Sequence, residues 1–224
     1  MNRTVCVIPI KTHSSRLPNK NFRQLGDKPL FKWLIESVVR ACCFSDIYID
    51  SDSEIIEQYA IDMRIKFIQR LPRLAQGGAG GNDLIEYYRA VIPDYDYYFQ
   101  AHVTSPFLSE ATIRQCHDIL VNSSEYDSIL TVQDIKKFTW YQLSNRTNRY
   151  QAINYNPKIL PRTQDLKSMF QETSGLYGVK ADVFDEIRCR IGNKPYFFII
   201  DNEKEAIDID TIDDFKYAEY MLRR

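Results

Sequence analysis

The sequence has no apolar run long enough to be a membrane anchor or a signal peptide. The N-terminal apolar stretch, residues 5–10, stops at Lys11. It is shorter than the core of a signal peptide, and no later stretch approaches the length that spans a bilayer. We therefore expect a cytoplasmic protein that does not contact a membrane.

The chain also lacks an excess of charge of either sign. It has 29 Lys and Arg residues against 30 Asp and Glu residues, which gives a formal net charge of −1. Because no global field would attract nucleic acid or an anionic surface, nucleic acid is not expected as a partner. Any site for an anion must therefore be local.

Cysteine patterns typical of metal binding or redox chemistry are absent too. The sequence contains no C-x-x-C pair and no His spacing that suits zinc, which leaves reduced thiols as the interpretation. The cysteines are Cys6, Cys42, Cys43, Cys116 and Cys189.

The chain does show an alternation of strand-like and helix-like segments. With 224 residues, 44% of them hydrophobic, it can form one domain with a sizeable core. Ser53, Ser109 and Thr211 are typical helix caps. The alternation predicts a single α/β domain over 1–224, with a mostly parallel sheet flanked by helices. We expect strands at 5–10, 46–50, 65–70, 95–103, 127–133, 174–179, 196–200 and 205–210, and helices beginning at 29, 53, 82, 109, 181 and 211.

One segment interrupts this alternation. Residues 136–167 are polar, rich in Asn and Arg, and too long for an ordinary connection. The segment nevertheless carries large apolar side chains without the periodicity of a packed element. The segment is an inserted arm, a lid or a subunit contact, and because aromatic residues are favoured in interfaces we expect it to dock on a second subunit. These side chains are Phe138, Trp140, Tyr141, Leu143, Tyr150, Ile153, Tyr155 and Ile159.

The loops that follow the strands are expected to hold the chemistry, because ligands of open parallel sheets bind beyond the carboxyl ends of the strands. The first loop, KTHSSRLPNKN at 11–21, carries Lys11, Arg16 and Lys20 among hydroxyl side chains and no acidic residue. It is not a Walker loop. Cations and backbone N–H groups in such a turn favour a phosphate chain, although a solvated basic turn has the same composition.

Two aspartates near the C-terminus form a second candidate site. In IDID at 207–210, a strand would project Asp208 and Asp210 from one face and pack Ile207 and Ile209 behind them. Two carboxylates on one face suit a hard divalent cation, Mg²⁺ or Mn²⁺. An ordinary half-exposed strand shows the same alternation, so the pattern alone does not decide between them.

Two further loops are less specific. Four glycines and one alanine fill positions 77–81, which predicts a mobile loop that either links elements or closes over a ligand. Arg70 and Arg73 just before it favour closure. In AHVTSPF at 101–107, Thr104 and Ser105 follow a strand and either line a site or lead into the next helix.

A set of segments, in this order along the chain, is distinctive as a whole: IPIKTHSSRLPNKNFRQLGDKPL, IDSDSEII, AHVTSPFLSEATI, PRTQ, SGLYGV and EAIDIDTIDDFKYAE. Together they resemble the acylneuraminate cytidylyltransferase family, which makes CMP-sialic acid and related CMP-activated sugars. The resemblance runs from Thr4 to Leu222 and is weakest over 136–159. It implies a Rossmann-like nucleotide-diphospho-sugar transferase fold, a divalent metal, and a homodimer whose arm reaches the partner subunit.

Residue roles follow from the resemblance by position. Lys11 stands where the family usually has an arginine, His102 stands for a glutamine, and Gln171 replaces an arginine often assigned to the sugar carboxylate. The implied catalytic residues are Lys11, Lys20, Asp208 and Asp210, the last two as metal ligands. The implied nucleotide-binding residues are Lys11, Ser14, Ser15, Arg16, Asn19, Lys20, Arg70 and Asn82. The implied substrate-binding residues are His102, Thr104, Ser105, Arg162, Gln164, Gln171 and Thr173.

The implied reaction is the metal-dependent transfer of CMP from CTP to a sugar, expected to be a keto-acid sugar of the sialic acid type, with release of pyrophosphate. The cations of loop 11–21 would stabilise charge on the departing oxygens. His102 is a candidate for the base. Alternatives are a nucleotidyltransferase that uses another nucleoside triphosphate or a sugar phosphate, a D-x-D glycosyltransferase, and a non-catalytic nucleotide-binding relative.

Overall fold

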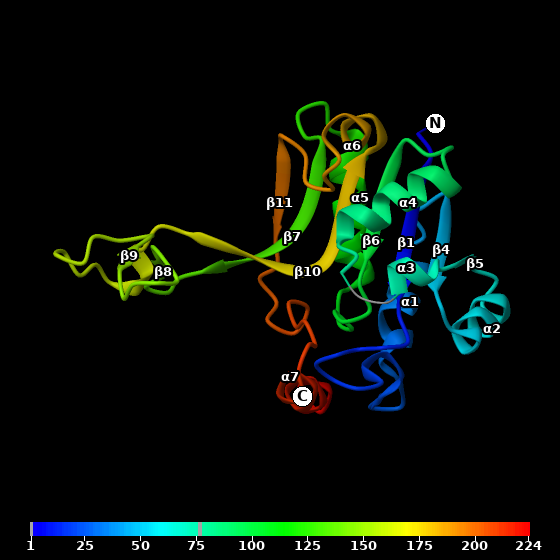
Figure 1. Cartoon of the computed structure of the whole chain (residues 1–224), viewed down its shortest axis with the longest axis horizontal. Coiled ribbons are helices and arrows are strands. Elements are labelled where there is room, and N and C mark those ends of the chain that lie inside the picture. The colour runs from blue at the N-terminus through cyan, green and yellow to red at the C-terminus, as the bar shows by residue number, and fades with distance from the viewer. Residues whose placement is uncertain (1, 76–77) are drawn as a thin grey trace.

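A seven-stranded sheet forms the centre of the protein. The computed structural model describes residues 2–75 and 78–224. The strand order is β11-β7-β10-β6-β1-β4-β5, and β10 is antiparallel to both its neighbours while the other pairs are parallel (Figure 1). The predicted α/β fold with a mostly parallel sheet is confirmed. The strands are β1 (Thr4–Ile10), β4 (Asp46–Ser51), β5 (Lys66–Gln69), β6 (Tyr97–Ala101), β7 (Ser128–Ile135), β10 (Met169–Lys180) and β11 (Pro195–Ile199).

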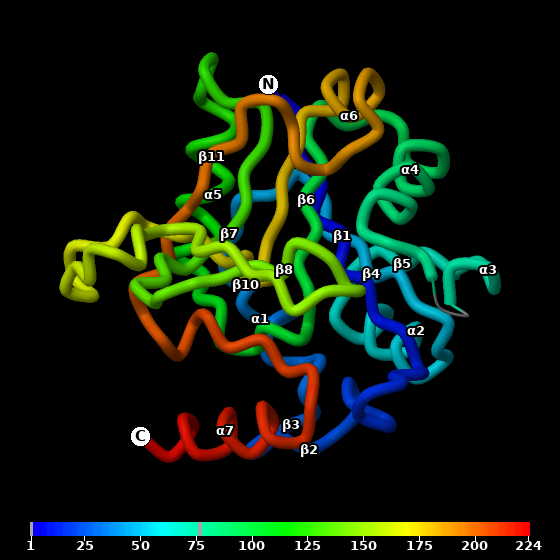
Figure 2. Tube along the Cα trace, turned by 60° about the vertical axis from the view of Figure 1, so that its left-hand side comes forward, coloured from blue at the N-terminus to red at the C-terminus, as the bar shows by residue number. Residues whose placement is uncertain are grey.

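Helices cover both faces of the sheet (Figures 1 and 2). Successive side chains of β1 point to opposite faces, so Ile8 packs in a cluster with α1, α2 and α5, whereas Val7 packs with α3, α4 and α6. Burial on both faces is what the continuous apolar run 5–10 predicts. The helices are α1 (Leu30–Ala41), α2 (Glu54–Asp62), α3 (Pro72–Ala75), α4 (Gly81–Val91), α5 (Glu110–Asn122), α6 (Ala181–Ile187) and α7 (Ile212–Leu222).

The predicted helix caps are confirmed. The side chains of Ser53, Ser109 and Thr211 each accept a hydrogen bond from the backbone N–H three residues later, at 3.4, 3.1 and 3.3 Å. These bonds satisfy N–H groups that a helix leaves free at its first turn. None of the helices in the described part of the chain has both the length and the apolar character that crossing a membrane requires.

The segment 205–210 differs from the prediction, because it forms no strand although every one of its residues is described. The alternation in its burial is real: Ile207 and Ile209 are buried against α7 and a two-stranded ribbon of β2 (Gln24–Leu25) and β3 (Lys28–Pro29). The backbone N–H of Ile209 bonds to the carbonyl of Thr104 at 2.7 Å instead of to a neighbouring strand. The packing of Ile207 and Ile209 against α7 therefore produces the same alternation of buried and exposed residues as a strand.

Residues 136–168 form an extension between β7 and β10. Figure 1 shows these two strands running on from the sheet and carrying a small ribbon, which extends away from the body of the molecule. Trp140, Tyr141 and Tyr150 in this ribbon have exposed fractions of 47%, 44% and 55%. The ribbon consists of β8 (Trp140–Gln142) and β9 (Tyr150–Ala152), and the remaining short elements are the 3₁₀ helices η1 (Lys20–Phe22) and η2 (Thr163–Asp165).

Candidate active site

The loop after β1 is held by side chains at both of its ends. The N–H and Oγ1 of Thr12 donate to the two carboxylate oxygens of Asp52, at 2.9 and 2.6 Å. Burial acts to raise the pKa of Asp52, but the bonds from Thr12 outweigh it and lower the pKa. At the other end, Nδ2 of Asn21 donates to the carbonyl of Lys11 at 2.9 Å. The loop backbone is thereby fixed above the end of the strand.

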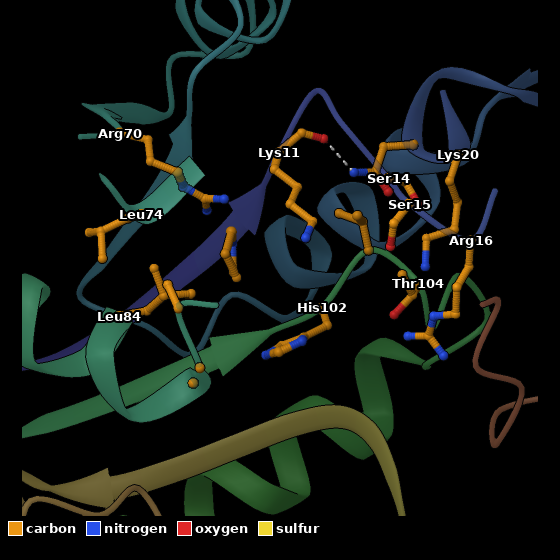
Figure 3. A pocket seen from close by; sticks show the side chains of 16 residues that line it. Lys11, Ser14, Ser15, Arg16, Lys20, Arg70, Leu74, Leu84, His102 and Thr104 are labelled. Atoms are coloured by element: carbon orange, nitrogen blue, oxygen red, sulfur yellow. Dashed lines mark hydrogen bonds between the residues drawn. The ribbon is translucent and has the colours of Figure 1, made fainter. Parts of the chain in front are cut away.

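A cavity of about 260 Å³ lies between this loop, the ends of β5 and β6, and the start of α4. Figure 3 shows Lys11, Arg70 and His102 around it, each from a different element. Among residues 2–75 and 78–224, four basic side chains and no acidic one line this cavity: Lys11, Arg16, Lys20 and Arg70. Such a lining favours a ligand with several negative charges.

Asp210 joins the C-terminal segment to the loop 11–21. Its Oδ1 accepts a hydrogen bond from Nζ of Lys20 at 2.9 Å, and its Oδ2 lies 2.8 Å from Nη1 of Arg16. Nζ of Lys20 also donates to the carbonyl of Ile209 at 2.7 Å, and the Lys20 side chain is only 9% exposed. The carboxylate thus offsets part of the positive charge at the edge of the cavity.

Arg70 is held by a buried carboxylate. Its Nε and Nη2 donate to Oδ2 of Asp50 at 3.0 and 2.6 Å, and the hydroxyl of Tyr88 donates to the same oxygen at 2.6 Å. Burial, followed by the charge of Asp50, raises the pKa of Tyr88 well above its ordinary value, so the hydroxyl keeps its proton. Nη1 of Arg70 forms no hydrogen bond within the described residues. The guanidinium is therefore fixed on one edge and can bind a ligand in the cavity with the other.

His102 follows β6 and forms another part of the cavity wall (Figure 3). Its pKa is lowered to about 3, first by burial and then by the charges of Arg190, Arg70 and Lys20. The imidazole is therefore neutral near pH 7. Its Nε2 lies 3.5 Å from Nη1 of Arg190, a long contact in which the guanidinium is the donor.

Asp208 has a carboxylate oxygen that could hold a cation. Its Oδ1 is buried and has no hydrogen-bond partner within residues 2–75 and 78–224. Burial raises the pKa of Asp208, and the charge of Asp210 contributes to the rise. In this part of the chain no group of three or more His, Cys, Asp and Glu side chains is placed to hold a metal. An orphaned carboxylate oxygen of this kind fits a divalent cation, for which Asp208 would supply one ligand.

The structure brings many of the predicted site residues to the one cavity. Loop 11–21 contributes most of them, β5 leads to Arg70, and the segment after β6 contributes two. Asp210 reaches this cavity only through its ion pairs, and Asp208 lines a neighbouring cavity with Gln133 and Asp214. The predicted residues that line the cavity are Lys11, Ser14, Ser15, Arg16, Lys20, Arg70, His102 and Thr104.

The other predicted residues do not line it. Asn19 borders a separate surface hollow beside Phe22. The side chain of Asn82 accepts a hydrogen bond from the backbone N–H of Arg190 at 2.9 Å. Ser105 and Thr173 are buried and bonded to each other, Oγ of Ser105 donating to the Thr173 carbonyl at 3.4 Å.

Three predicted substrate-binding residues lie further away. Gln171 is exposed on β10. Arg162 and Gln164 lie on the extension, where Arg162 pairs with Asp165 at 2.8 Å. In a single chain these side chains do not take part in the cavity.

Sequence reasoning missed three residues of the site. Asn21 lines the cavity with a buried Oδ1 that has no partner in the described part of the chain, and its place next to Lys20 could have revealed it. Asp50 and Arg190 had no local signal, because their partners lie 20 and 90 residues away. Of the predicted glycine-rich loop, Gly77 lies outside the described residues, and Gly81 begins α4.

The structure is an α/β protein of the nucleotidyltransferase fold with a basic cavity at the carboxyl ends of its strands. A structure of CMP:2-keto-3-deoxy-manno-octonic acid synthetase complexed with CTP superposes with a TM-score of 0.69 at 15% identity, covering 99% of each chain. The 4-diphosphocytidyl-2C-methyl-D-erythritol synthase of Anaerococcus prevotii has a TM-score of 0.71 at 12% identity, covering 100% of this chain and 97% of that one. At these identities the likeness shows the fold.

The family described as Cytidylyltransferase matches residues 5–219, and the chain belongs to this family. It is 25% identical over 212 residues to N-acylneuraminate cytidylyltransferase A of Danio rerio, covering 94% of this chain but 49% of the relative. It is 22% identical over 233 residues to pseudaminic acid cytidylyltransferase of Campylobacter jejuni, covering 99% and 97%. The chain thus spans about half the length of the first relative and nearly all of the second. The predicted family, one of nucleotidyltransferases, is confirmed.

Proposed function

We propose that this protein transfers CMP from CTP to a sugar acid of the sialic, pseudaminic or 2-keto-3-deoxy-octonic type and releases pyrophosphate. The observation that carries the proposal is the convergence of Lys11, Arg16, Lys20 and Arg70 on one cavity at the carboxyl ends of the strands, in a chain of the cytidylyltransferase family. The names of the relatives and of the CTP-complexed structure support CTP and a sugar acid as substrates.

In the proposed reaction the hydroxyl oxygen of the acceptor forms a bond to the α-phosphorus. The bond from that phosphorus to the oxygen bridging it to the β-phosphorus breaks, and its electron pair leaves with pyrophosphate. Lys11 and Arg16 neutralise the negative charge that grows on the departing oxygens, and Lys20 supplies a further, more deeply buried cation. Arg70 binds the nucleotide with its open edge.

We include a divalent cation, Mg²⁺ or Mn²⁺, in this proposal. Asp208 would hold it through the orphaned Oδ1, together with Asp210. When bound, the cation polarises phosphate oxygens and makes the acceptor hydroxyl more acidic. The structure favours this role for Asp208, because a buried carboxylate oxygen without a partner costs free energy unless a ligand satisfies it.

His102 orients the acceptor by hydrogen bonding and does not remove its proton. A base whose conjugate acid has a pKa near 3 has little driving force to take a proton near pH 7. The proton of the acceptor hydroxyl therefore passes to solvent.

We further propose that the protein is a homodimer and that residues 136–167 dock on the partner subunit. The extension exposes Trp140, Tyr141 and Tyr150, although Phe138 and Tyr155 meet edge to face with ring centroids 4.7 Å apart. Exposed aromatic groups on a projecting ribbon bury area at small entropic cost when they enter an interface. Docking would bring Arg162 of one subunit toward the cavity of the other.

The proposed function is tested by measuring pyrophosphate release from each of the four nucleoside triphosphates with a panel of acceptors, with Mg²⁺ and after chelation. The panel contains keto-acid sugars, simple sugars and sugar phosphates. We expect release with CTP and a keto-acid sugar only, and loss of release after chelation. Release of a nucleoside diphosphate from a nucleotide sugar would identify a glycosyltransferase instead, and nucleotide binding without turnover would identify a non-catalytic relative.

A further inference from the structure

Arg190 reaches the wall of the cavity from a distant part of the chain. It lies in the loop after α6, and its Nη1 donates to Oε1 of Gln100 at 2.9 Å, close to the end of β6. A Cβ atom added to Gly81 would lie 2.1 Å from this nitrogen. Because Gly81 and His102 both line the cavity, the guanidinium sits directly behind that wall. The guanidinium of Arg190 can occupy this place because Gly81 has no side chain.

Arg190 makes no direct ion pair with the described residues, although the nearby carboxylate of Glu172 acts to raise its pKa. Arg89 pairs with Asp185 and Arg188 lies 3.8 Å from Glu86, whereas Arg190 forms no ion pair within residues 2–75 and 78–224. Its burial lowers its pKa, which measures the free energy lost when the cation leaves water. A half-buried cation without a direct ion pair is costly, so an anionic ligand would stabilise Arg190.

The surroundings of Arg190 fix its plane but leave donors available. The guanidinium carbon lies 3.5 Å from the centroid of the Tyr177 ring, a stacked cation–π contact. The hydroxyl of Tyr177 donates to Glu172, at 2.5 Å, which holds the ring in place. Among the described residues only Nη1 of Arg190 makes a side-chain hydrogen bond, so the donors on Nε and Nη2 remain for a ligand. A planar fork of this kind suits carboxylate and phosphate oxygens.

The position of Arg190 separates it from the cations of loop 11–21. Arg190 lies behind His102, which lines the cavity, whereas Lys11, Arg16 and Lys20 line the same cavity from the loop. In the proposed reaction the loop holds the phosphates of CTP. An anion at Arg190 therefore belongs to the other substrate.

We propose that Arg190 is a specificity-determining residue that binds an anionic group of the acceptor, a carboxylate or a phosphate, with Tyr177 and Gln100 orienting its guanidinium. This inference rests on the proposed function and adds a residue that selects acidic acceptors over neutral ones. Arg190 would also supply a cation for such acceptors in a chain that has Gln171 at the position where the family often has an arginine.

The test compares Arg190→Gln with Arg188→Gln, since each removes one charge and keeps a long polar side chain, two positions apart. Acceptors are N-acetylneuraminate, pseudaminate, 2-keto-3-deoxy-manno-octonate, their methyl esters, and ribose 5-phosphate as the phosphate source. Acceptor KM and CTP KM are measured from pyrophosphate release. Binding of the same compounds to the CMP-saturated protein is measured by calorimetry, which does not depend on turnover.

We expect Arg190→Gln to weaken binding of the acidic acceptor and raise its KM by about 10-fold to 100-fold, as for a lost charged hydrogen bond. The ester, CTP and the Arg188→Gln protein should be unaffected. Arg190→Lys keeps the charge but loses the fork, so it should show a smaller loss and provides the test if Arg190→Gln does not fold. A specific effect on ribose 5-phosphate identifies phosphate as the group, and one on the sugar acids identifies carboxylate.

Two results would overturn the inference: equal losses for acid and ester, which mark a structural role, or an acid affinity unchanged in Arg190→Gln or absent from the wild-type protein. Acid binding that depends on Arg190 without any release of pyrophosphate supports the inference and contradicts the proposed function. If instead the protein turns over a sugar acid equally well with and without Arg190, the result supports the proposed function and contradicts the inference.

Discussion

Loop 11–21 and the extension 136–167 are both polar segments, but they differ in how far their side chains are packed within the chain. In the loop the side chain of Lys20 is held in place, because it is almost buried and donates hydrogen bonds to both Asp210 and the carbonyl of Ile209. On the extension, Leu160 has an exposed fraction of 79% and Trp140 of 47%. The loop is completed by contacts within its own chain. In the proposed dimer the extension would be completed by the partner subunit, so changes in the two regions should have different consequences.

The largest effect is expected where the loop meets the C-terminal segment. Asp210→Asn should reduce turnover on the order of 10²-fold to 10³-fold, because it disturbs the proposed metal site and the cations of the loop together. It should also lower the free energy of unfolding, since Lys20 would keep a buried charge with a weaker partner. Steady-state kinetics and urea titrations measure the two effects, with Asp213→Asn as an exposed control.

Asp208→Asn sharpens this prediction. Burial raises the pKa of Asp208, so the charged form is disfavoured in the fold and a neutral amide should leave stability equal or higher. Activity should nevertheless fall, and chelation of the metal should add little to the fall. Full activity of Asp208→Asn with Mg²⁺ present would remove Asp208 from the proposed metal site.

The second largest effect concerns the buried pair behind the cavity. Asp50→Asn leaves the Arg70 guanidinium, whose side chain is 3% exposed, without its carboxylate. We expect a loss of about 3–5 kcal/mol in the free energy of unfolding and a higher KM for the nucleotide, because Arg70 would no longer be fixed. Tyr88→Phe removes one hydrogen bond to the same carboxylate and should cost less, about 1.5–3 kcal/mol. Asp62→Asn is the exposed control, and equal stability of Asp50→Asn and this control contradicts the prediction.

The extension should respond in the opposite way. Replacing Trp140 and Tyr141 together with Ser should hardly change the stability of the monomer, because both side chains are more than two-fifths exposed. Sedimentation should show loss of a dimer, with impaired sugar saturation and largely intact nucleotide binding. The matched control replaces Tyr217 and Tyr220 on α7, which are exposed to a similar degree. A wild-type protein that sediments as a monomer at micromolar concentration, or a double variant that stays a fully active dimer, would remove the extension from the interface.

A dependence of stability on pH is expected only below neutral pH. The pKa of His102 is about 3 in the folded protein and near 6.5 when unfolded, so the unfolded state binds more protons between these values. Stability should therefore fall as pH is lowered from about 6.5, by at most about 1.4 kcal/mol per pH unit for this group. His102→Gln should flatten that part of the profile, whereas His13→Gln, an exposed control, should not. Identical profiles for wild type and His102→Gln would show that His102 does not stay neutral in the fold.

The sequence by itself determined the local structure and the position of the first loop. Several features depend only on residues that are close in sequence, so they can be predicted without knowledge of the fold. They are the spacing of apolar residues, the apolar run 5–10, and the helix caps at Ser53, Ser109 and Thr211. The loop 11–21 was recognisable because its cations are close in sequence and follow a buried strand. The resemblance over 4–222 led to the family for the same reason, since each of its motifs is a continuous stretch of sequence.

Only the tertiary structure decided how distant segments complete the site. The alternate burial at 205–210 arises from packing against α7 and not from a strand. Both arrangements bury every second residue, so the sequence pattern could not distinguish them. Arg70 depends on Asp50 and Tyr88, and Arg190 meets Gln100 and His102 through a gap left by Gly81. Such contacts join elements that the sheet brings together, and their partners are tens of residues apart. Local periodicity carries no information about which buried charge will face which partner.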